Sequence, residues 1–457
     1  MIIPLSLVGL VALVSLGLLA SPYPALAPGA VLGLAGTLVL YRKPAWGLLA
    51  IAALVPLEGI LKDKLLSGAK LVGVGMILIL TLQLAVRQLP ASRLASNQWR
   101  LLLPFLALYL LSLWTSDLLP MSLAHLREIS VGLIVFGITL LVARELSLPM
   151  LARLVTVTVC ISCLFALFMA KYQQGGRASA SLDPNNFALL ITFAMPLALW
   201  LAIKTRWLPL RLFWIGCCVL LLAGITKTES RSGLVVMLAS LGILLVHYRE
   251  QVARIRPRHL GFAMLGLAVL IPAGAALMPE GYAARIQSLM LLKGGVNAHK
   301  DESLGRRASY LLVGRSMIAH SPVLGTGPGT FPLHYARSGY AVAFAPSNKA
   351  AELYRAAHNT YLQVTSETGV PAGLLFVGMV LLAIRNFWHA RRLWLARGDR
   401  ENADLMTHLT MSMMAMGIFL MFLTAYNHKY LWLMLALSSV LVRQAAEPRR
   451  QEVAPCN

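Results

Sequence analysis

The stretch FALLITFAMPLALWLAIKTRWLPLRLFWIGCCVLLLAGI, residues 187–225, holds two long apolar runs joined by a short basic link. The link contains Lys204, Arg206 and Arg211. An α-helix needs roughly 20 apolar residues to cross about 30 Å of hydrocarbon. Because each run approaches that length, the stretch predicts two membrane-spanning helices connected on one side of a bilayer.

Similar apolar runs recur along the whole chain, which has 457 residues and is 58% hydrophobic and only 13% charged. A single soluble core does not account for this pattern. Candidate spans lie at residues 3–20, 25–41, 45–60, 69–86, 101–118, 127–143, 150–170, 187–203, 210–225, 233–247, 260–278, 366–386, 406–424 and 429–442. Since several of these are short, we predict an all-α integral membrane protein with about 12 to 14 transmembrane helices.

Basic residues gather in alternate links between these runs, so the net charge of +22 is a topology signal rather than a nucleic-acid footprint. We therefore expect no nucleic-acid partner. The positive-inside rule places these links and both termini in the cytoplasm. The link with Lys62, Lys64 and Lys70 argues weakly for the opposite orientation.

This orientation leaves one long segment outside, residues 279–365, which exceeds an ordinary connection in length. We expect residues 1–278 to form N-terminal spans with short links, residues 366–442 to form C-terminal spans, and residues 443–457 to form a cytoplasmic tail. Within the long loop, residues 309–319 predict a helix, and PVLGTGPGTFP at 322–332 predicts a turn-rich connection.

Polar residues stand out in two short external links. Asp183 to Asn185 (DPN) is typical of a helix N-cap, whereas Arg177 has no comparable structural duty. In TKTESRSG, residues 226–233, charged side chains crowd between two spans, where charge is costly unless it is paired or used. Pairing of Glu229 with a neighbouring cation is the structural alternative.

A third polar cluster lies where the long loop returns to the membrane and includes Tyr354, Arg355, His358, Asn359 and Gln363. Helical spacing from Tyr354 through His358 to Gln363 would direct these groups to one external cavity, where a neutral imidazole can act as a general base.

The long loop also supplies Arg306, Arg307 and Arg315, and its excess of basic residues indicates an anionic ligand. We expect no metal, because the external segments lack paired acidic or histidine motifs. Guanidinium groups would neutralise a diphosphate instead.

The segments GRASASLDPNNFA (176–188), TKTESRSG (226–233), RRASYLLVGRSMIAHSPVLGTGPGTF (306–331) and HNTYLQ (358–363) resemble the O-antigen ligase and polymerase superfamily. These are bacterial inner-membrane enzymes that use undecaprenyl-diphosphate glycans. The resemblance implies an architecture similar to C-type glycosyltransferases, with a periplasmic active site and no metal or other cofactor. It also implies that His358 is the catalytic histidine and that Arg177 and Arg231 are the external arginines of the catalytic site.

The implied reaction transfers a glycan from undecaprenyl diphosphate to a sugar hydroxyl of the lipid A-core oligosaccharide, with inversion. His358 would take the acceptor proton, while Arg177 and Arg231 would hold the diphosphate. Besides the donor and acceptor, the surrounding lipids are expected partners. We also expect further substrate-binding residues, namely Lys227, Arg307, Arg315, Tyr354 and Asn359.

Three alternatives stay open. An O-antigen polymerase, or a ligase that glycosylates a protein, would use the same donor with a different acceptor. A secondary transporter would also have many spans, but it predicts mid-membrane charges and an inverted repeat, neither of which the sequence indicates.

Overall fold

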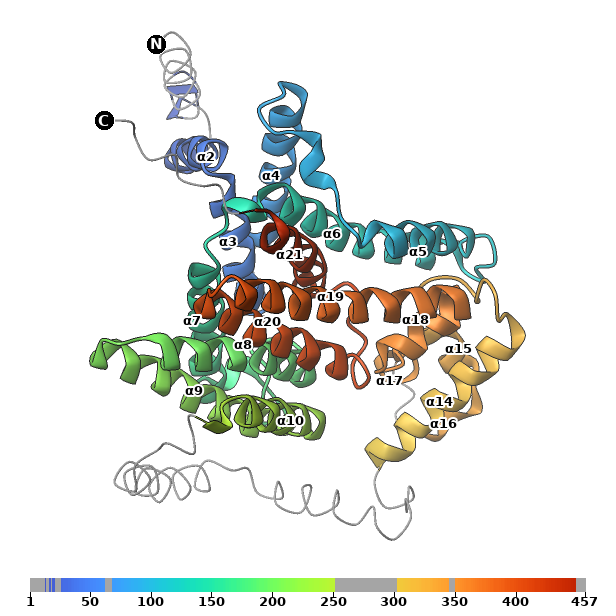
Figure 1. The fold of residues 1–457 in the computed structure, drawn as a ribbon. Helices are drawn as coiled ribbons and strands as arrows, with labels where there is room; N and C mark the ends of the chain where they lie inside the picture. Colours follow the sequence, from blue (N-terminus) through green and yellow to red (C-terminus); the bar gives the residue numbers. More distant parts are fainter. Residues whose placement is uncertain are drawn as a thin grey trace, which may run out of the picture.

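The computed structural model describes residues 26–61, 68–250, 302–344 and 350–448, with a few residues between 13 and 20. Almost all secondary structure in these residues is helical (Figure 1). The one sheet is a hairpin of β1 (Gln173–Gln174) and β2 (Arg177–Ala178), in which Gln173 pairs with Ala178.

The helices of the first half run in chain order from the blue to the green end of Figure 1. Their bounds are α2 (Leu26–Arg42), α3 (Pro44–Leu54), η1 (Val55–Leu57), α4 (Gly68–Ala85), η2 (Ala91–Leu94), α5 (Trp99–Leu111), α6 (Leu119–Val142), η3 (Ala143–Glu145), α7 (Leu148–Phe168), η4 (Ala170–Tyr172), α8 (Pro184–Lys204), α9 (Leu208–Thr228) and α10 (Arg231–His247).

The second half begins with a group of short helices and ends with three long ones. Their bounds are α14 (Glu302–His320), α15 (Phe331–Arg337), α16 (Gly339–Ala343), α17 (Ala350–Leu353), α18 (Thr360–Thr368), α19 (Val370–Ala396), α20 (Arg400–Phe419) and α21 (Lys429–Ala446).

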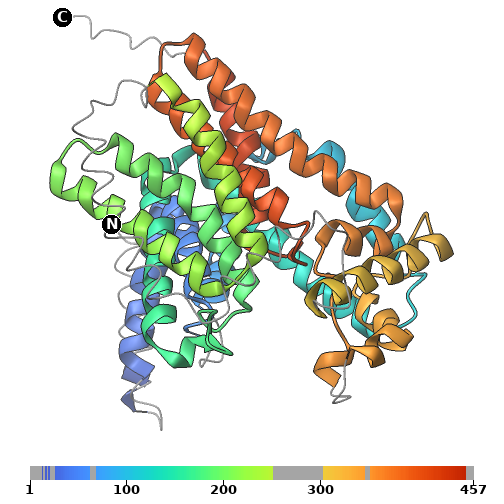
Figure 2. The same cartoon turned by 90° about the horizontal axis from the view of Figure 1, so that it is seen from below.

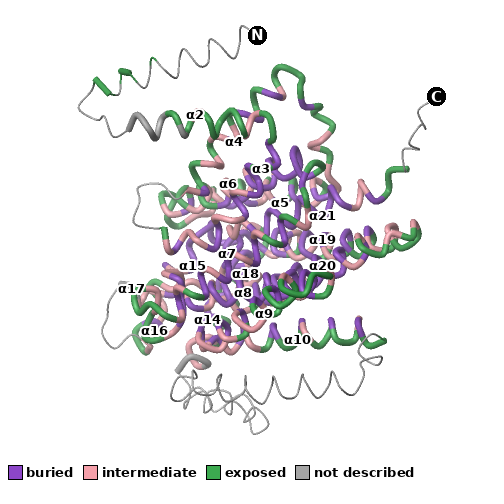
Figure 3. The backbone as a smooth tube through the Cα atoms, turned by 90° about the vertical axis from the view of Figure 1, so that its left-hand side faces the viewer, coloured by how far each residue is buried: buried purple, intermediate pink, exposed green. Residues whose placement is uncertain are grey.

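The interior of the bundle is formed by α8, α19, α20 and α21. Helix α20 packs against the other three, and α19 also packs against α21. Every residue of α21 from Tyr430 to Leu441 is buried, so this helix faces protein on all sides. Figure 3 shows α8 and α20 among the buried segments, whereas much of α10 is exposed. Gly132 of α6 permits close packing on α21, because a Cβ there would lie 2.2 Å from the indole nitrogen of Trp432.

Six helices within the described residues are long and apolar enough to cross a membrane, which confirms an all-α integral membrane protein. They match the spans predicted at 69–86, 127–143, 150–170, 187–203, 210–225 and 366–386. The runs at 25–41 and 45–60 form a pair bent by 118°, which counts as one further span or as a re-entrant element.

Other predicted spans differ from this pattern. The runs at 101–118 and 233–247 form shorter apolar helices, of 13 and 17 residues. The helices at 406–424 and 429–442 are buried within the bundle. Runs 3–20 and 260–278 lie outside the described residues, apart from a few positions of the former. The total of 12 to 14 spans therefore stays a prediction.

The described part of the long loop is helical rather than extended. The predicted helix at 309–319 is part of α14, and the predicted turn-rich segment contains Gly325, Gly327 and Gly329, all with positive φ. In Figures 1 and 2 the helices α14 to α17 lie to one side of the main bundle, beside α5. The segment joins the bundle through α18, which packs on α19.

Segments predicted to lie outside meet at one end of the bundle. Arg177 Nε donates to the carbonyl oxygen of Thr228 at 2.9 Å, and Thr360 Oγ1 donates to the carbonyl of Leu423 at 2.6 Å. These bonds join links that are far apart in the sequence.

Residues from the basic links also contact one another. Arg93 pairs with Glu145 at 2.7 Å, Arg144 pairs with Glu447, and Lys204 pairs with Asp404 at 3.1 Å. These contacts agree with the prediction that the basic links lie at one end of the bundle. That this end faces the cytoplasm stays a prediction.

The orientation can be tested by labelling. Tyr340→Cys, in α16, should react with a membrane-impermeant maleimide in intact cells, whereas Trp207→Cys, in a basic link, should react only after permeabilisation. Both side chains are exposed, at 43% and 68%, so accessibility of the thiol reports the side of the membrane. A green fluorescent protein fused to the C-terminus should fluoresce because positive-inside topology keeps it in the cytoplasm. Labelling of Trp207→Cys in intact cells would show that the predicted orientation is wrong.

Candidate functional site

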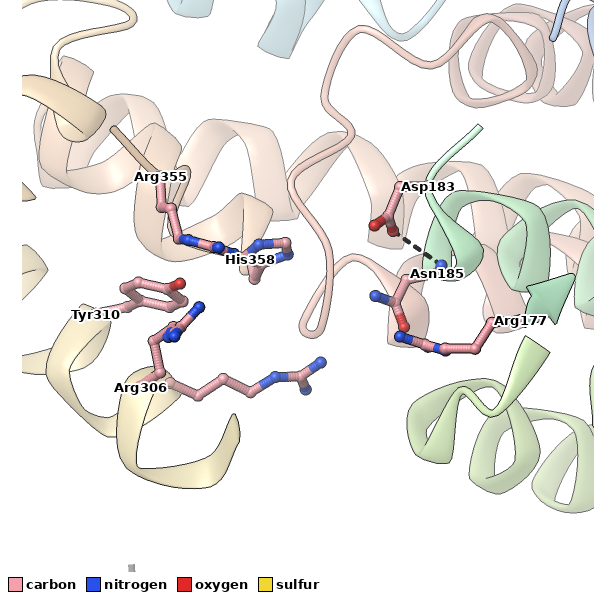
Figure 4. Close-up of a pocket in the computed structure, with 8 residues that line it drawn as sticks. Arg177, Asp183, Asn185, Arg306, Tyr310, Arg355 and His358 are labelled. Carbon is pink, nitrogen blue, oxygen red and sulfur yellow. Dashed lines mark hydrogen bonds between the residues drawn. The ribbon is translucent and has the colours of Figure 1, made fainter. Parts of the chain in front are cut away.

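A polar pocket of about 300 Å³ lies where the segments predicted to be external meet. Its lining residues are Arg177, Asp183, Asn185, Arg306, Arg307, Tyr310, Arg355 and His358. Figure 4 shows Arg355, His358, Tyr310 and Arg306 on one side, with Arg177, Asp183 and Asn185 opposite. We call this cavity the arginine pocket.

The first wall of the arginine pocket is built around the start of α8. Asp183 is the N-cap of this helix, and its carboxylate accepts hydrogen bonds from the backbone N–H groups of Asn185 at 2.8 Å and Asn186 at 3.4 Å. This confirms the predicted cap. Ser230, the N-cap of α10, donates to Asn185 Oδ1 at 2.9 Å and thereby joins the starts of the two helices.

The second wall comes from one face of α14. Tyr310 follows Arg306 by four residues and Arg307 by three, so an α-helix brings its side chain next to each of theirs. Arg306 is anchored by a 2.7 Å hydrogen bond from Nη2 to the carbonyl oxygen of Phe344. The Tyr310 ring stacks on the His358 imidazole with centroids 5.7 Å apart and planes inclined by 26°.

His358 lies in the connection between α17 and α18 and has a positive φ of 46°. A non-glycine residue adopts this left-handed conformation at an energetic cost, so the surrounding contacts must hold it. Directly after it, Asn359 caps α18 by accepting a 3.1 Å hydrogen bond from the backbone N–H of Leu362. The imidazole is thus fixed between a stacked ring and a capped helix start.

Buried hydrogen bonds fix α18 itself. Gln363 Oε1 accepts from the backbone N–H of Ala357 at 3.1 Å and from the Thr424 hydroxyl at 2.8 Å. Gln363 Nε2 donates to Glu367 Oε1 at 3.0 Å, and that oxygen also accepts from the backbone N–H of Phe331 at 3.1 Å. Glu367 therefore connects the helix that follows His358 with the glycine-containing turn before α15.

The electrostatics of the arginine pocket favour a neutral histidine and a bound anion. Burial lowers the pKa of His358; Asp183 opposes this shift, while Arg307 and the neighbouring arginines add to it. Burial also lowers the pKa of Arg307, and the nearby charge of Arg231 contributes to that shift. Positive charge gathered in a partly buried site is stabilised when an anion binds.

The structure brings together only some of the predicted site residues. His358, Arg177 and Arg307 line the arginine pocket, and Arg231 is close enough to act electrostatically on Arg307. Lys227 is not among the lining residues, and Arg315 and Tyr354 are exposed.

The predicted helix through Tyr354, His358 and Gln363 is wrong. The chain is not helical from Tyr354 to Asn359, because the left-handed His358 and the cap at Asn359 begin a new helix. Gln363 is a buried link between backbone segments instead of a lining residue, and Asn359 serves as the cap.

The sequence patterns did not identify Tyr310. They marked Arg306 and Arg355 as basic residues of the long loop without giving them a role in the site, and they assigned Asp183 and Asn185 only to a helix cap. Helical spacing would have identified Tyr310 if the helix predicted at 309–319 had been extended back to Arg306 and Arg307, as the observed α14 is. No local pattern distinguishes a helix cap that also lines a pocket from one that does not. The place of Asp183 in the pocket could therefore be identified only from the tertiary structure.

No group of three His, Cys, Asp or Glu side chains suited to a metal ion occurs within the described ranges. The expectation of a metal-free site stays a prediction.

The bundle and its polar pocket define a multi-pass membrane protein with an arginine-lined pocket at one end. Residues 216–377 match the model of a protein family described as O-Antigen ligase. This segment of the chain is therefore similar to the O-antigen ligase family, in agreement with the resemblance that the motifs indicated. The matched segment includes Arg307, Tyr310 and His358, whereas Arg177 and Asp183 precede it. No curated protein sequence matches the chain.

Glu367 should make the stability of the protein depend on pH. Burial raises the pKa of this carboxyl to about 7 from its ordinary value of 4.5. Because the folded-state pKa is raised, the stabilising contribution is complete below about 4.5 and is lost as the pH rises through about 7. Thermal unfolding in detergent should show a melting temperature that falls across this window. Glu367→Gln should flatten the slope, since an amide does not titrate there.

Asp399→Asn is a matched control at the opposite, basic-link end, where the carboxylate caps α20. This variant should keep the slope of the unaltered protein. An unchanged slope in Glu367→Gln would show that another group causes the pH dependence.

Proposed function

We propose that this protein transfers O-antigen polysaccharide from undecaprenyl diphosphate to a sugar hydroxyl of the lipid A-core oligosaccharide, at the periplasmic face of the bacterial inner membrane. The similarity of residues 216–377 to the O-antigen ligase family supports ligase- or polymerase-type activity on a lipid-linked glycan. The observation that carries the proposal is a partly buried histidine in one pocket with four arginines. The histidine can accept a proton, and the arginines can hold an anion.

In the proposed reaction the acceptor oxygen attacks the anomeric carbon from the face opposite the diphosphate. The new carbon–oxygen bond forms as the bond to the phosphate oxygen breaks, which inverts the configuration. The hydroxyl proton goes to His358, and the electron pair of the broken bond remains on the diphosphate. A neutral imidazole is required at the start, and the lowered pKa of His358 favours that form.

The arginines stabilise the leaving group. Arg177 and Arg355 each use one N–H in a bond to a backbone carbonyl, of Thr228 at 2.9 Å and of Glu352 at 3.2 Å, which orients the guanidinium groups. Charge-assisted hydrogen bonds from such groups to phosphate strengthen as negative charge accumulates on the leaving oxygen. Arg307 lines the same pocket, and Arg231 adds positive charge nearby.

The bound donor should also strengthen the base. Its diphosphate offsets the positive charge that lowers the pKa of His358, so the imidazole becomes more basic once the donor is in place. The site would thereby couple donor binding to acceptor activation. Polymerase or protein-ligase activity uses the same chemistry, and the identity of the acceptor separates these alternatives.

The roles of His358 and Arg177 can be separated by kinetics. His358→Ala should bind undecaprenyl-diphosphate glycan nearly normally but lose about 10² to 10⁴ in the rate of transfer to lipid A-core. Arg177→Ala should raise the donor KM and also lower kcat, because it contacts the diphosphate in both states. Arg177→Lys should recover only part of this loss, since an ammonium lacks the planar fork.

Matched controls are His320→Ala, at the exposed end of α14, and Arg211→Ala, an exposed residue near the start of α9. Both should transfer at the rate of the unaltered protein. Near-normal transfer by folded His358→Ala would remove the base assignment.

The pH dependence of kcat/KM gives an independent test. A protonated imidazole cannot accept the proton, so the rate should fall as the pH decreases through the pKa of His358. Because that pKa is lowered, the acidic limb should lie below 6.5. Arg355→Gln removes one of the charges that lower the pKa, so the limb should move towards 6.5. If the acidic limb of the pH profile is unchanged in Arg355→Gln, a group other than His358 causes it.

A further inference from the structure

A second polar cavity, of about 250 Å³, lies against the start of α8. Its lining residues are Val55, Glu58, Leu182, Asn186, Leu190, Asn427, His428 and Lys429. At roughly 30 Å³ for each water molecule of the liquid, this volume equals about eight waters. The cavity therefore has room for one small polar ring.

The same turn of chain separates this cavity from the arginine pocket. Leu182 and Asn186 line the second cavity, whereas Asp183 and Asn185 line the arginine pocket. The two spaces thus flank the capped start of α8.

The opposite wall of the second cavity is tied to the segment that carries His358. Asn427 and His428 belong to the link between α20 and α21. In that link the backbone N–H of Ala425 donates to Thr360 Oγ1 at 2.9 Å, and Thr360 Oγ1 donates to the carbonyl of Leu423. Thr360 is the first residue of α18, two positions after His358.

The charges in the second cavity balance, in contrast to those of the arginine pocket. Lys429 Nζ lies 2.5 and 2.6 Å from the two carboxylate oxygens of Glu58, and the side chains are only 14% and 24% exposed. The remaining polar groups are two amides and an imidazole. His428 Nδ1 accepts from the backbone N–H of Tyr430 at 3.2 Å, so the neutral ring carries its proton on Nε2.

This chemistry suits a neutral polyol. Sugar hydroxyls both donate and accept hydrogen bonds, and amides, a carboxylate and an ammonium offer partners for both roles. The apolar side chains of Val55, Leu182 and Leu190 can contact the C–H groups of a sugar ring. A diphosphate would instead prefer the arginine pocket, where positive charge is in excess.

We propose that the second cavity binds a sugar ring of the acceptor glycan and so positions the attacking hydroxyl for His358. The inference rests on the proposed function, whose acceptor must approach the anomeric carbon from the side opposite the diphosphate. A sugar of the donor glycan has the same chemistry, and the kinetic test below distinguishes these two sources.

Asn186→Leu is the most direct test. The side-chain amide of Asn186 makes none of the hydrogen bonds assigned within the described residues, and leucine fills a similar volume without donors or acceptors. With undecaprenyl-diphosphate glycan and lipid A-core as substrates, the acceptor KM should rise about tenfold. The donor KM and the kcat should stay unchanged, because the arginine pocket is intact.

A second variant, Glu58→Gln, keeps the shape of the side chain but removes its charge, and it should raise the acceptor KM in the same way. Asn402→Ala, at the start of α20, is the matched control and should leave both KM values unchanged. Thermal unfolding of each variant checks that it is folded.

A rise in the donor KM alone, or unchanged KM values in both folded variants, would overturn the acceptor assignment. Absence of transfer to lipid A-core by the unaltered protein would contradict the proposed function itself, so the two failures are distinguishable.

Discussion

The hydrogen bonds that fix the start of α18 are the constraint on which the arrangement of the site depends. Thr360 and Gln363 connect this helix to the link before α21, and Gln363 also binds the backbone of Ala357. These groups are buried, so breaking one bond leaves an unsatisfied polar atom, which costs about 1–3 kcal/mol. The network holds His358 in its left-handed conformation, which an isolated peptide would rarely adopt.

A second constraint is electrostatic. The arginine pocket collects cations from the β2 strand, from α14 and from the connection before α18, and the packed bundle must compensate for their mutual repulsion. Asp183 supplies one opposing charge, yet its carboxylate already caps α8. An anionic ligand would relieve the repulsion, so in the proposed function the bound diphosphate also stabilises the site.

The capped start of α8 divides the two polar spaces. The side with excess positive charge matches a diphosphate, and the side with balanced charge and amides matches a neutral sugar. This division permits two chemically different substrates to approach one reaction centre from different directions. Both spaces are bordered by segments hydrogen-bonded to the start of α18, so a single local structure sets the position of the base relative to each.

The sequence alone determined the class of protein, several individual spans, the cap at Asp183 and the helix within α14, because hydropathy, caps and helical periodicity are local properties. It also singled out His358, Arg177 and Arg307. Only the tertiary structure decided that Tyr310 stacks on His358, that Gln363 and Asn359 support the backbone, and that α21 lies inside the bundle. These outcomes depend on packing between segments that are distant in the chain, as between Tyr310 and His358, and no local pattern encodes such contacts.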